Sequence, residues 1–113
     1  MTSPTVLITG ATGDAGRHVT PAVQALGFSI RAQHRSGPGA DATIDWRRWD
    51  FGEGLDPAPL VEGCQAVIHL AAEMRDASRM DAVNARASLE LARAAEAAGA
   101  RYFGYASSIA VHG

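Results

Sequence analysis

Three glycines recur at spacing three in the stretch TGATGDAG, which covers residues 9–16 and follows the apolar run at 5–8. Gly10 allows a tight turn out of a strand, Gly13 lets the backbone approach a ligand closely, and Gly16 lets a following helix lie tightly against a sheet. The free N–H groups at the start of that helix then face an anion. This stretch therefore indicates the binding of a phosphate or diphosphate, unless the glycines only connect two elements.

Other side chains with functional chemistry are fewer. Asn84 falls near the middle of the apolar stripe of an expected helix, where a buried amide needs a partner, so it either braces the backbone or contacts a ligand. His69 is expected to be a packed strand residue rather than a ligand, and Cys64 a small core residue. The four histidines have no metal-ligand spacing, and we expect no metal site.

Alternating strands and helices must position these residues. Apolar runs and turn residues predict strands at Thr5–Thr9, Phe28–His34, Ala42–Trp49, Gln65–Leu70 and Arg101–Ala106. Helical spacing predicts a helix at Ala15–Leu26, which Pro21 should kink or shorten, and a helix from a capping Ser78 to a stop at Gly99. Leu55–Glu62 is expected to be a short helix or turn. Strands and helices at this spacing indicate an α/β, doubly wound parallel sheet, which binds ligands at the carboxyl ends of its strands.

Composition excludes several classes of function. The chain has 113 residues, 47% of them hydrophobic, which is enough for one ordinary domain with a single core. A net charge of −2 without a basic stripe argues against nucleic acid or a membrane surface as partner. The sequence shows no apolar run of about 18 residues and no signal-peptide pattern, and a single cysteine forms no internal disulfide. We therefore expect a cytoplasmic enzyme or binding domain.

Five motifs, in their order and spacing, resemble the extended or atypical short-chain dehydrogenase/reductase family, often described as NAD-dependent epimerase/dehydratase. They are TGATGDAG, the pair Asp50-Phe51, HLAA at 69–72, Asn84, and ASSIAVHG at 106–113. The resemblance spans the whole chain and implies a Rossmann-type sheet, truncated after the fifth strand. Residues 1–113 would then be the dinucleotide-binding domain of an oxidoreductase or epimerase that transfers hydride between nicotinamide and a hydroxyl or carbonyl group, with the substrate-binding C-terminal part absent.

The resemblance also implies roles for individual residues. The Asp50 carboxylate would meet the adenine amino group and the Phe51 backbone would contact the ring, although Asp50 could instead cap the short helix that follows. The other implied cofactor contacts, from the glycine loop, from the HLAA strand end and from the helix that ends before Gly99, are Gly10, Ala11, Thr12, Gly13, Asp14, Ala15, Gly16, Leu70, Ala71, Ala72 and Asn84.

The end of the second strand bears on the choice between NAD and NADP. A carboxylate there binds the adenosine ribose diol and selects NAD, whereas an arginine can pair with a 2′-phosphate and select NADP. In the family the discriminating acid usually falls at the position of His34, so its absence and the neighbouring Arg35 favour NADP. NAD stays the alternative, because Arg35 could be only a solvated loop charge.

The chain also departs from the family pattern. The motif implies that Ser108 is catalytic and hydrogen-bonds the substrate while a tyrosine exchanges the proton. That tyrosine belongs to a Tyr-x-x-x-Lys pair downstream of the serine, but these 113 residues contain no lysine and therefore no such pair. Two hypotheses therefore stay open, the cofactor-binding part of an enzyme and a non-catalytic domain that senses NAD(P). A homodimer is one open arrangement, and the substrate is not indicated.

Overall fold

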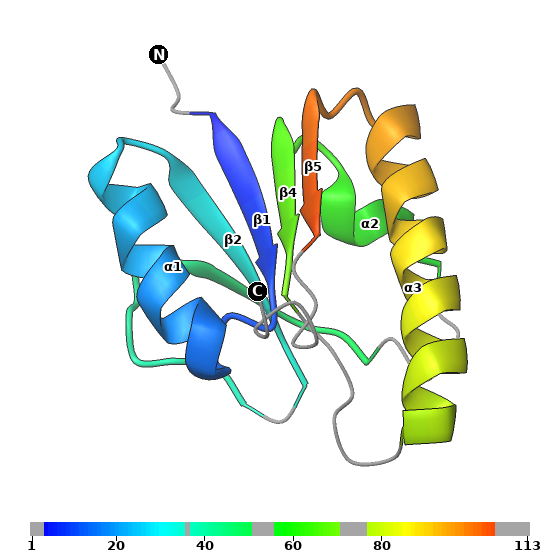
Figure 1. Cartoon of the computed structure of the whole chain (residues 1–113). Coiled ribbons are helices and arrows are strands. Elements are labelled where there is room, and N and C mark those ends of the chain that lie inside the picture. Colours follow the sequence, from blue (N-terminus) through cyan, green and yellow to red (C-terminus); the bar gives the residue numbers. More distant parts are fainter. Residues whose placement is uncertain (1–3, 36, 51–55, 71–76, 106–113) are drawn as a thin grey trace.

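The protein is described from a computed structural model that covers residues 4–35, 37–50, 56–70 and 77–105. Five parallel strands form one sheet in the order β3-β2-β1-β4-β5 (Figure 1). The strands are β1 (Thr5–Thr9), β2 (Ser29–His34), β3 (Asp45–Arg48), β4 (Ala66–His69) and β5 (Tyr102–Tyr105). The helices are α1 (Asp14–Ala25), α2 (Ala58–Val61) and α3 (Ala77–Ala97). This is the α/β, Rossmann-type architecture expected from the sequence.

The sheet is covered on both faces, by α1 on one side and by α2 and α3 on the other (Figure 1). Successive residues of β1 point to opposite faces, so its continuous apolar run supplies two cores. Ile8 packs with Ile30 and Ala32 beneath α1. Leu7 packs with Val67 and Leu91 beneath α3. The buried β1 is thereby fixed at the centre of the sheet, and the chain reverses its direction of winding between β1 and β4.

Some element boundaries differ from those expected. Strand β3 is shorter than the predicted Ala42–Trp49, and α3 begins at Ala77 rather than at a capping Ser78. Helix α1 continues four residues beyond Pro21, so the proline does not end it. In α3 the structure buries Leu91 and Ala95, and Ala98, just past the end of the helix, is exposed.

Candidate functional site

The glycine stretch forms a tight loop between β1 and α1, and each glycine meets a different constraint. Gly10 has φ of +66°, a left-handed conformation that favours glycine. The N–H of Gly13 donates to the carbonyl of Gly10 over 3.0 Å and closes the turn. A Cβ on Gly16 would lie 2.5 Å from the Cα of Ala11, so only glycine lets α1 start this close to the loop. The expected structural roles of Gly10 and Gly16 are therefore present.

The first turn of α1 begins beside exposed residues of the glycine loop. Gly13 occupies the N-cap position, and its carbonyl accepts from the N–H of Arg17 at 3.0 Å. Glycine has no side chain, so this N-cap residue cannot itself accept a hydrogen bond from the N–H groups of the first turn. Thr12 and Gly13 are exposed, so a ligand can reach this end of the helix. Such a helix N-terminus favours an anion.

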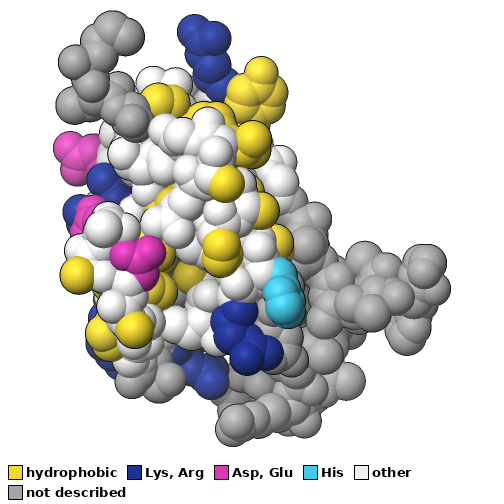
Figure 2. All heavy atoms as spheres, turned by 90° about the vertical axis from the view of Figure 1, so that its left-hand side faces the viewer, with side chains coloured by type: hydrophobic (Ala, Val, Ile, Leu, Met, Phe, Trp, Pro, Cys, Tyr) yellow, Lys and Arg dark blue, Asp and Glu magenta, His cyan; other side chains and the backbone are white. Residues whose placement is uncertain are grey.

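The surface around α1 carries basic side chains, some of them toward the same end of the molecule. Figure 2 shows basic side chains in the lower half of this face, the end at which the loop before α1 lies in Figure 1, and others at its top and upper left. Hydrophobic side chains on this face are scattered. The charge arrangement is compatible with a phosphate-bearing ligand.

Gln33, which sequence reasoning missed, contacts the glycine loop from the end of β2. Its side chain is 3% exposed, and its Oε1 accepts from the N–H of Gly10 at 2.7 Å. Its Nε2 donates to the carbonyl of Trp49 at 2.5 Å. The available signal was an amide inside an otherwise buried strand end, since a buried amide must find partners. The glutamine joins the ends of β1, β2 and β3.

His34 and Arg35 lie at the end of β2, next to the glycine loop. His34 is buried, with its ring centroid 6.2 Å from that of Trp46. Its carbonyl accepts from the N–H of Trp49 at 2.9 Å. Arg35 is exposed. The strand therefore ends with a histidine turned into the core and an arginine in solvent.

Asp50 lies two residues beyond the end of β3 and is half-buried. The alternative that it caps the following helix is wrong, because α2 begins only at Ala58. Pro57 occupies the N-cap position of α2 without a side-chain cap, and Oδ1 of the preceding Asp56 accepts from the N–H of Ala58 at 3.0 Å. Asp50 lies at the carboxyl edge of the sheet, where the glycine loop also lies.

Thr9 and His69 end the two strands at which the winding reverses. Oγ1 of Thr9 lies 2.6 Å from Nδ1 of His69 and accepts from the N–H of Leu70 at 2.9 Å. Burial lowers the pKa of His69 to about 4, so its ring is neutral at pH 7. His69 is thus a packed strand residue, as expected, and Leu70 is brought beside the end of β1.

Several residues singled out in the sequence lie outside the described part of the chain. These are Phe51, Ala71, Ala72 and Ser108. The backbones of Asp14 and Ala15 begin α1 and that of Asn84 lies in α3, but their side chains are not among those described. The structure therefore brings together the glycine loop, Gln33, the end of β2, Asp50 and Leu70.

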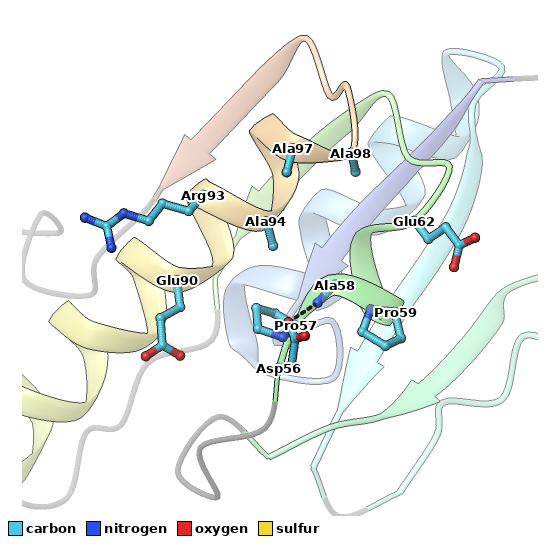
Figure 3. A pocket seen from close by; sticks show the side chains of 10 residues that line it. All are labelled: Asp56, Pro57, Ala58, Pro59, Glu62, Glu90, Arg93, Ala94, Ala97 and Ala98. Atoms are coloured by element: carbon cyan, nitrogen blue, oxygen red, sulfur yellow. Dashed lines mark hydrogen bonds between the residues drawn. The ribbon is translucent and has the colours of Figure 1, made fainter.

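A separate groove of about 750 Å³ lies between α2 and α3 (Figure 3). Its floor is apolar, with Pro57 and Pro59 from the α2 side and Ala94 and Ala97 from α3. None of the site residues expected from the sequence lines it. The groove is therefore distinct from the edge formed by the glycine loop.

Within the described ranges, no group of three or more histidine, cysteine, aspartate and glutamate side chains could hold a metal ion. Cys64 is buried and packs with Leu7 and Leu60, as expected for a small core residue. No helix in the described part of the chain is both long and apolar enough to cross a membrane.

Comparison with known proteins agrees with this geometry. The family model of the NAD dependent epimerase/dehydratase family matches residues 6–113. No curated protein matches the sequence. A short-chain dehydrogenase/reductase superfamily protein from Agrobacterium tumefaciens, solved with bound NAD, is 34% identical with a TM-score of 0.75 over 92% of this chain and 32% of its own.

Two further solved structures are similar. MoeE5, solved with UDP-glucuronic acid and NAD, is 27% identical with a TM-score of 0.75, over 96% of this chain and 38% of its own. UDP-N-acetylglucosamine 4-epimerase from Bacillus cereus is 24% identical with a TM-score of 0.75, over 95% of this chain and 36% of its own, and this likeness shows the fold alone. The chain thus spans about a third of the length of these proteins.

Proposed function

We propose, from the premise that this chain belongs to the NAD dependent epimerase/dehydratase family, that its glycine loop and the start of α1 bind the diphosphate of a nicotinamide dinucleotide. The observation that carries the proposal is the exposed glycine N-cap of α1 at Gly13, which has no side-chain cap hydrogen bond and lies at the carboxyl edge of a parallel sheet.

The residues present fit such a ligand. Thr12 and Gly13 are exposed and have a small or no side chain, so a diphosphate can approach the helix end. Asp50 and Leu70 follow β3 and β4 at the same edge, where we assign the adenine and ribose contacts.

The cofactor we favour is NADP. Strand β2 ends in the buried His34 and the exposed Arg35, so it presents no carboxylate to a ribose diol. Arginine forms bidentate, charge-assisted hydrogen bonds with phosphate, which suits the 2′-phosphate that distinguishes NADP. NAD is the alternative, and two of the similar structures were solved with it.

The reaction class we propose is hydride transfer between nicotinamide and a hydroxyl or carbonyl group. When bound, the nicotinamide supplies the hydride chemistry, and this chain holds and orients the cofactor. We assign residues 1–113 to the dinucleotide-binding unit and Ser108 to a hydrogen bond with the substrate oxygen. No substrate is assigned.

Calorimetric titration of the folded chain with NAD⁺ and with NADP⁺ tests the proposal. We expect saturable binding, weakened about tenfold by Gly13→Ala, because a methyl group would crowd the backbone surface beside the first turn of α1. Gly37→Ala is the matched control, since a Cβ at Gly37 meets nothing within 4 Å. Absence of heat with either cofactor at millimolar concentration would refute the proposal.

A further inference from the structure

We infer that Gln33 is a positioning residue that holds the glycine loop in its ligand-binding conformation. This inference rests on the proposed function, because it concerns the loop to which we assign the diphosphate. Gln33 need not touch the ligand. It acts by accepting a hydrogen bond from the N–H of Gly10 and by donating one to the carbonyl of Trp49.

The loop needs such support because its conformation begins at a residue of unusual backbone geometry. Gly10 has φ of +66° and great conformational freedom, so it does not by itself hold the turn. A hydrogen bond of 2.7 Å from its N–H to Oε1 of Gln33 fixes the orientation of that peptide plane. The N–H of the next residue, Ala11, donates to the backbone carbonyl of Gln33 at 3.4 Å. Gln33 of β2 therefore accepts hydrogen bonds from two consecutive N–H groups of the loop.

The other end of the Gln33 amide is anchored, so the acceptor cannot turn away. Nε2 donates to the carbonyl of Trp49 at 2.5 Å, and Trp49 is itself tied to β2 by its N–H bond to the carbonyl of His34 at 2.9 Å. The side chain of Gln33 is almost entirely buried, so water does not compete for either bond. A glutamine meets both requirements because it carries an acceptor and a donor on one planar group.

The same amide joins the two halves of the proposed cofactor site. Gly10 opens the loop assigned to the diphosphate, and Trp49 directly precedes Asp50, which is assigned to adenine. A rigid link between these points sets their separation before a ligand arrives. Preorganisation of this kind improves affinity because the loop has less freedom to lose on binding.

The test compares Gln33→Met with the wild-type chain, because methionine keeps the length of the side chain and removes both hydrogen bonds. Gln24→Met is the matched control, since the amide of Gln24 also bridges two segments, donating to Asp41 at 3.2 Å, but on the exposed side of α1. We expect Gln33→Met to weaken binding of ADP and of the preferred dinucleotide about tenfold, the effect of leaving a buried donor unsatisfied. Gln24→Met should leave both affinities unchanged.

A second readout needs no ligand. Amide hydrogen exchange measured by NMR on the unliganded chain should show faster exchange of the Gly10 N–H in Gln33→Met and an unchanged rate in Gln24→Met. Measurements well below the unfolding temperature separate this effect from loss of stability, because exchange of core amides such as that of Leu7 would then stay slow.

The outcomes are distinguishable. The role of Gln33 is overturned if Gln33→Met leaves the exchange of the Gly10 N–H unchanged. It is also overturned if the wild-type chain binds ADP and Gln33→Met binds it with the same affinity. Failure of the wild-type chain to bind any dinucleotide overturns the proposed function instead, and the exchange of Gly10 still decides whether Gln33 holds the loop.

Discussion

Oγ1 of Thr9 and Nδ1 of His69 lie 2.6 Å apart at the point where the winding of the sheet reverses. Both side chains are buried, and the same Thr9 oxygen accepts from the N–H of Leu70. The pair thus joins the end of β1, where the glycine loop begins, to the end of β4. A polar contact in this position couples the stability of the central sheet to the protonation of one histidine.

Stability should therefore fall as the solution becomes acidic. Burial lowers the pKa of His69 from 6.5 to about 4, so between these values the unfolded chain takes up a proton that the folded chain does not. We expect a loss in the free energy of unfolding that approaches about 3 kcal/mol at pH 4. Urea denaturation between pH 7 and pH 4 measures it.

The variant His69→Gln removes this titration. Its stability should vary less with pH between 6.5 and 4 than that of the wild type, even if its stability at pH 7 is lower. Hydrogen bonds lower the pKa values of the carboxyl groups of Asp41 and Asp45 below 3.8, so their losses fall at lower pH. Parallel pH profiles for variant and wild type would contradict the assignment to His69.

Gly16→Ala should destabilise the fold. The added Cβ would lie within 2.6 Å of the backbone of Ala11, and neither the loop nor α1 can move without disturbing the other. We expect the free energy of unfolding to fall by about 2 kcal/mol, as for overpacked cores. Chemical denaturation measures the change, with Gly37→Ala as a neutral control. A Gly16→Ala protein as stable as the control would show that the contact is not tight in solution.

Arg35→Ala should change cofactor preference rather than stability. If Arg35 pairs with the 2′-phosphate, its loss weakens NADP⁺ about tenfold and leaves NAD⁺ nearly unchanged, because only NADP⁺ carries that group. Paired titrations with the two cofactors measure the ratio. Arg101→Ala, which precedes β5 at the opposite end of the sheet, is the control. Equal weakening of both cofactors would assign Arg35 a different role.

Arg31→Met should loosen the attachment of α2. Nη1 of Arg31 donates to the carbonyls of Leu60 and Glu62 at 2.9 and 2.7 Å and to Sγ of Cys64 at 3.3 Å. Its removal should cost about 2 kcal/mol, since these charge-assisted bonds satisfy carbonyl groups at the end of a helix. Thermal denaturation measures the loss, and faster reaction of Cys64 with a thiol reagent reports the local opening. Arg93→Met, at an exposed position of α3, should change neither.

Leu91→Ala and Leu89→Ala form a matched pair on α3. Leu91 is fully buried against Leu7 and Val67, whereas Leu89 is 50% exposed. We expect Leu91→Ala to lower the free energy of unfolding by about 3 kcal/mol and Leu89→Ala by about 0.5 kcal/mol or less. Urea denaturation distinguishes them, and similar losses for the two would mean that α3 does not present the face described.

The sequence by itself determined the architecture. Apolar runs and turn residues predicted the five described strands, although β3 is shorter than expected, because local hydrophobic periodicity follows directly from which faces a segment covers. The spacing of Gly10, Gly13 and Gly16 likewise predicted a turn followed by a closely placed helix, since glycine is required wherever a Cβ would clash or φ is positive.

Only the tertiary structure decided which distant polar groups meet. Gln33 reaches Gly10 across 23 positions, and Thr9 reaches His69 across 60. Sequence periodicity does not predict such pairs, because the strand order and register of the sheet bring them together. The structure likewise turned His34 into the core and placed the start of α2 at Ala58, too far along the chain for Asp50 to cap it. These outcomes depend on how the ends of distant strands meet at one edge of the sheet, and no local stretch of the sequence encodes that arrangement.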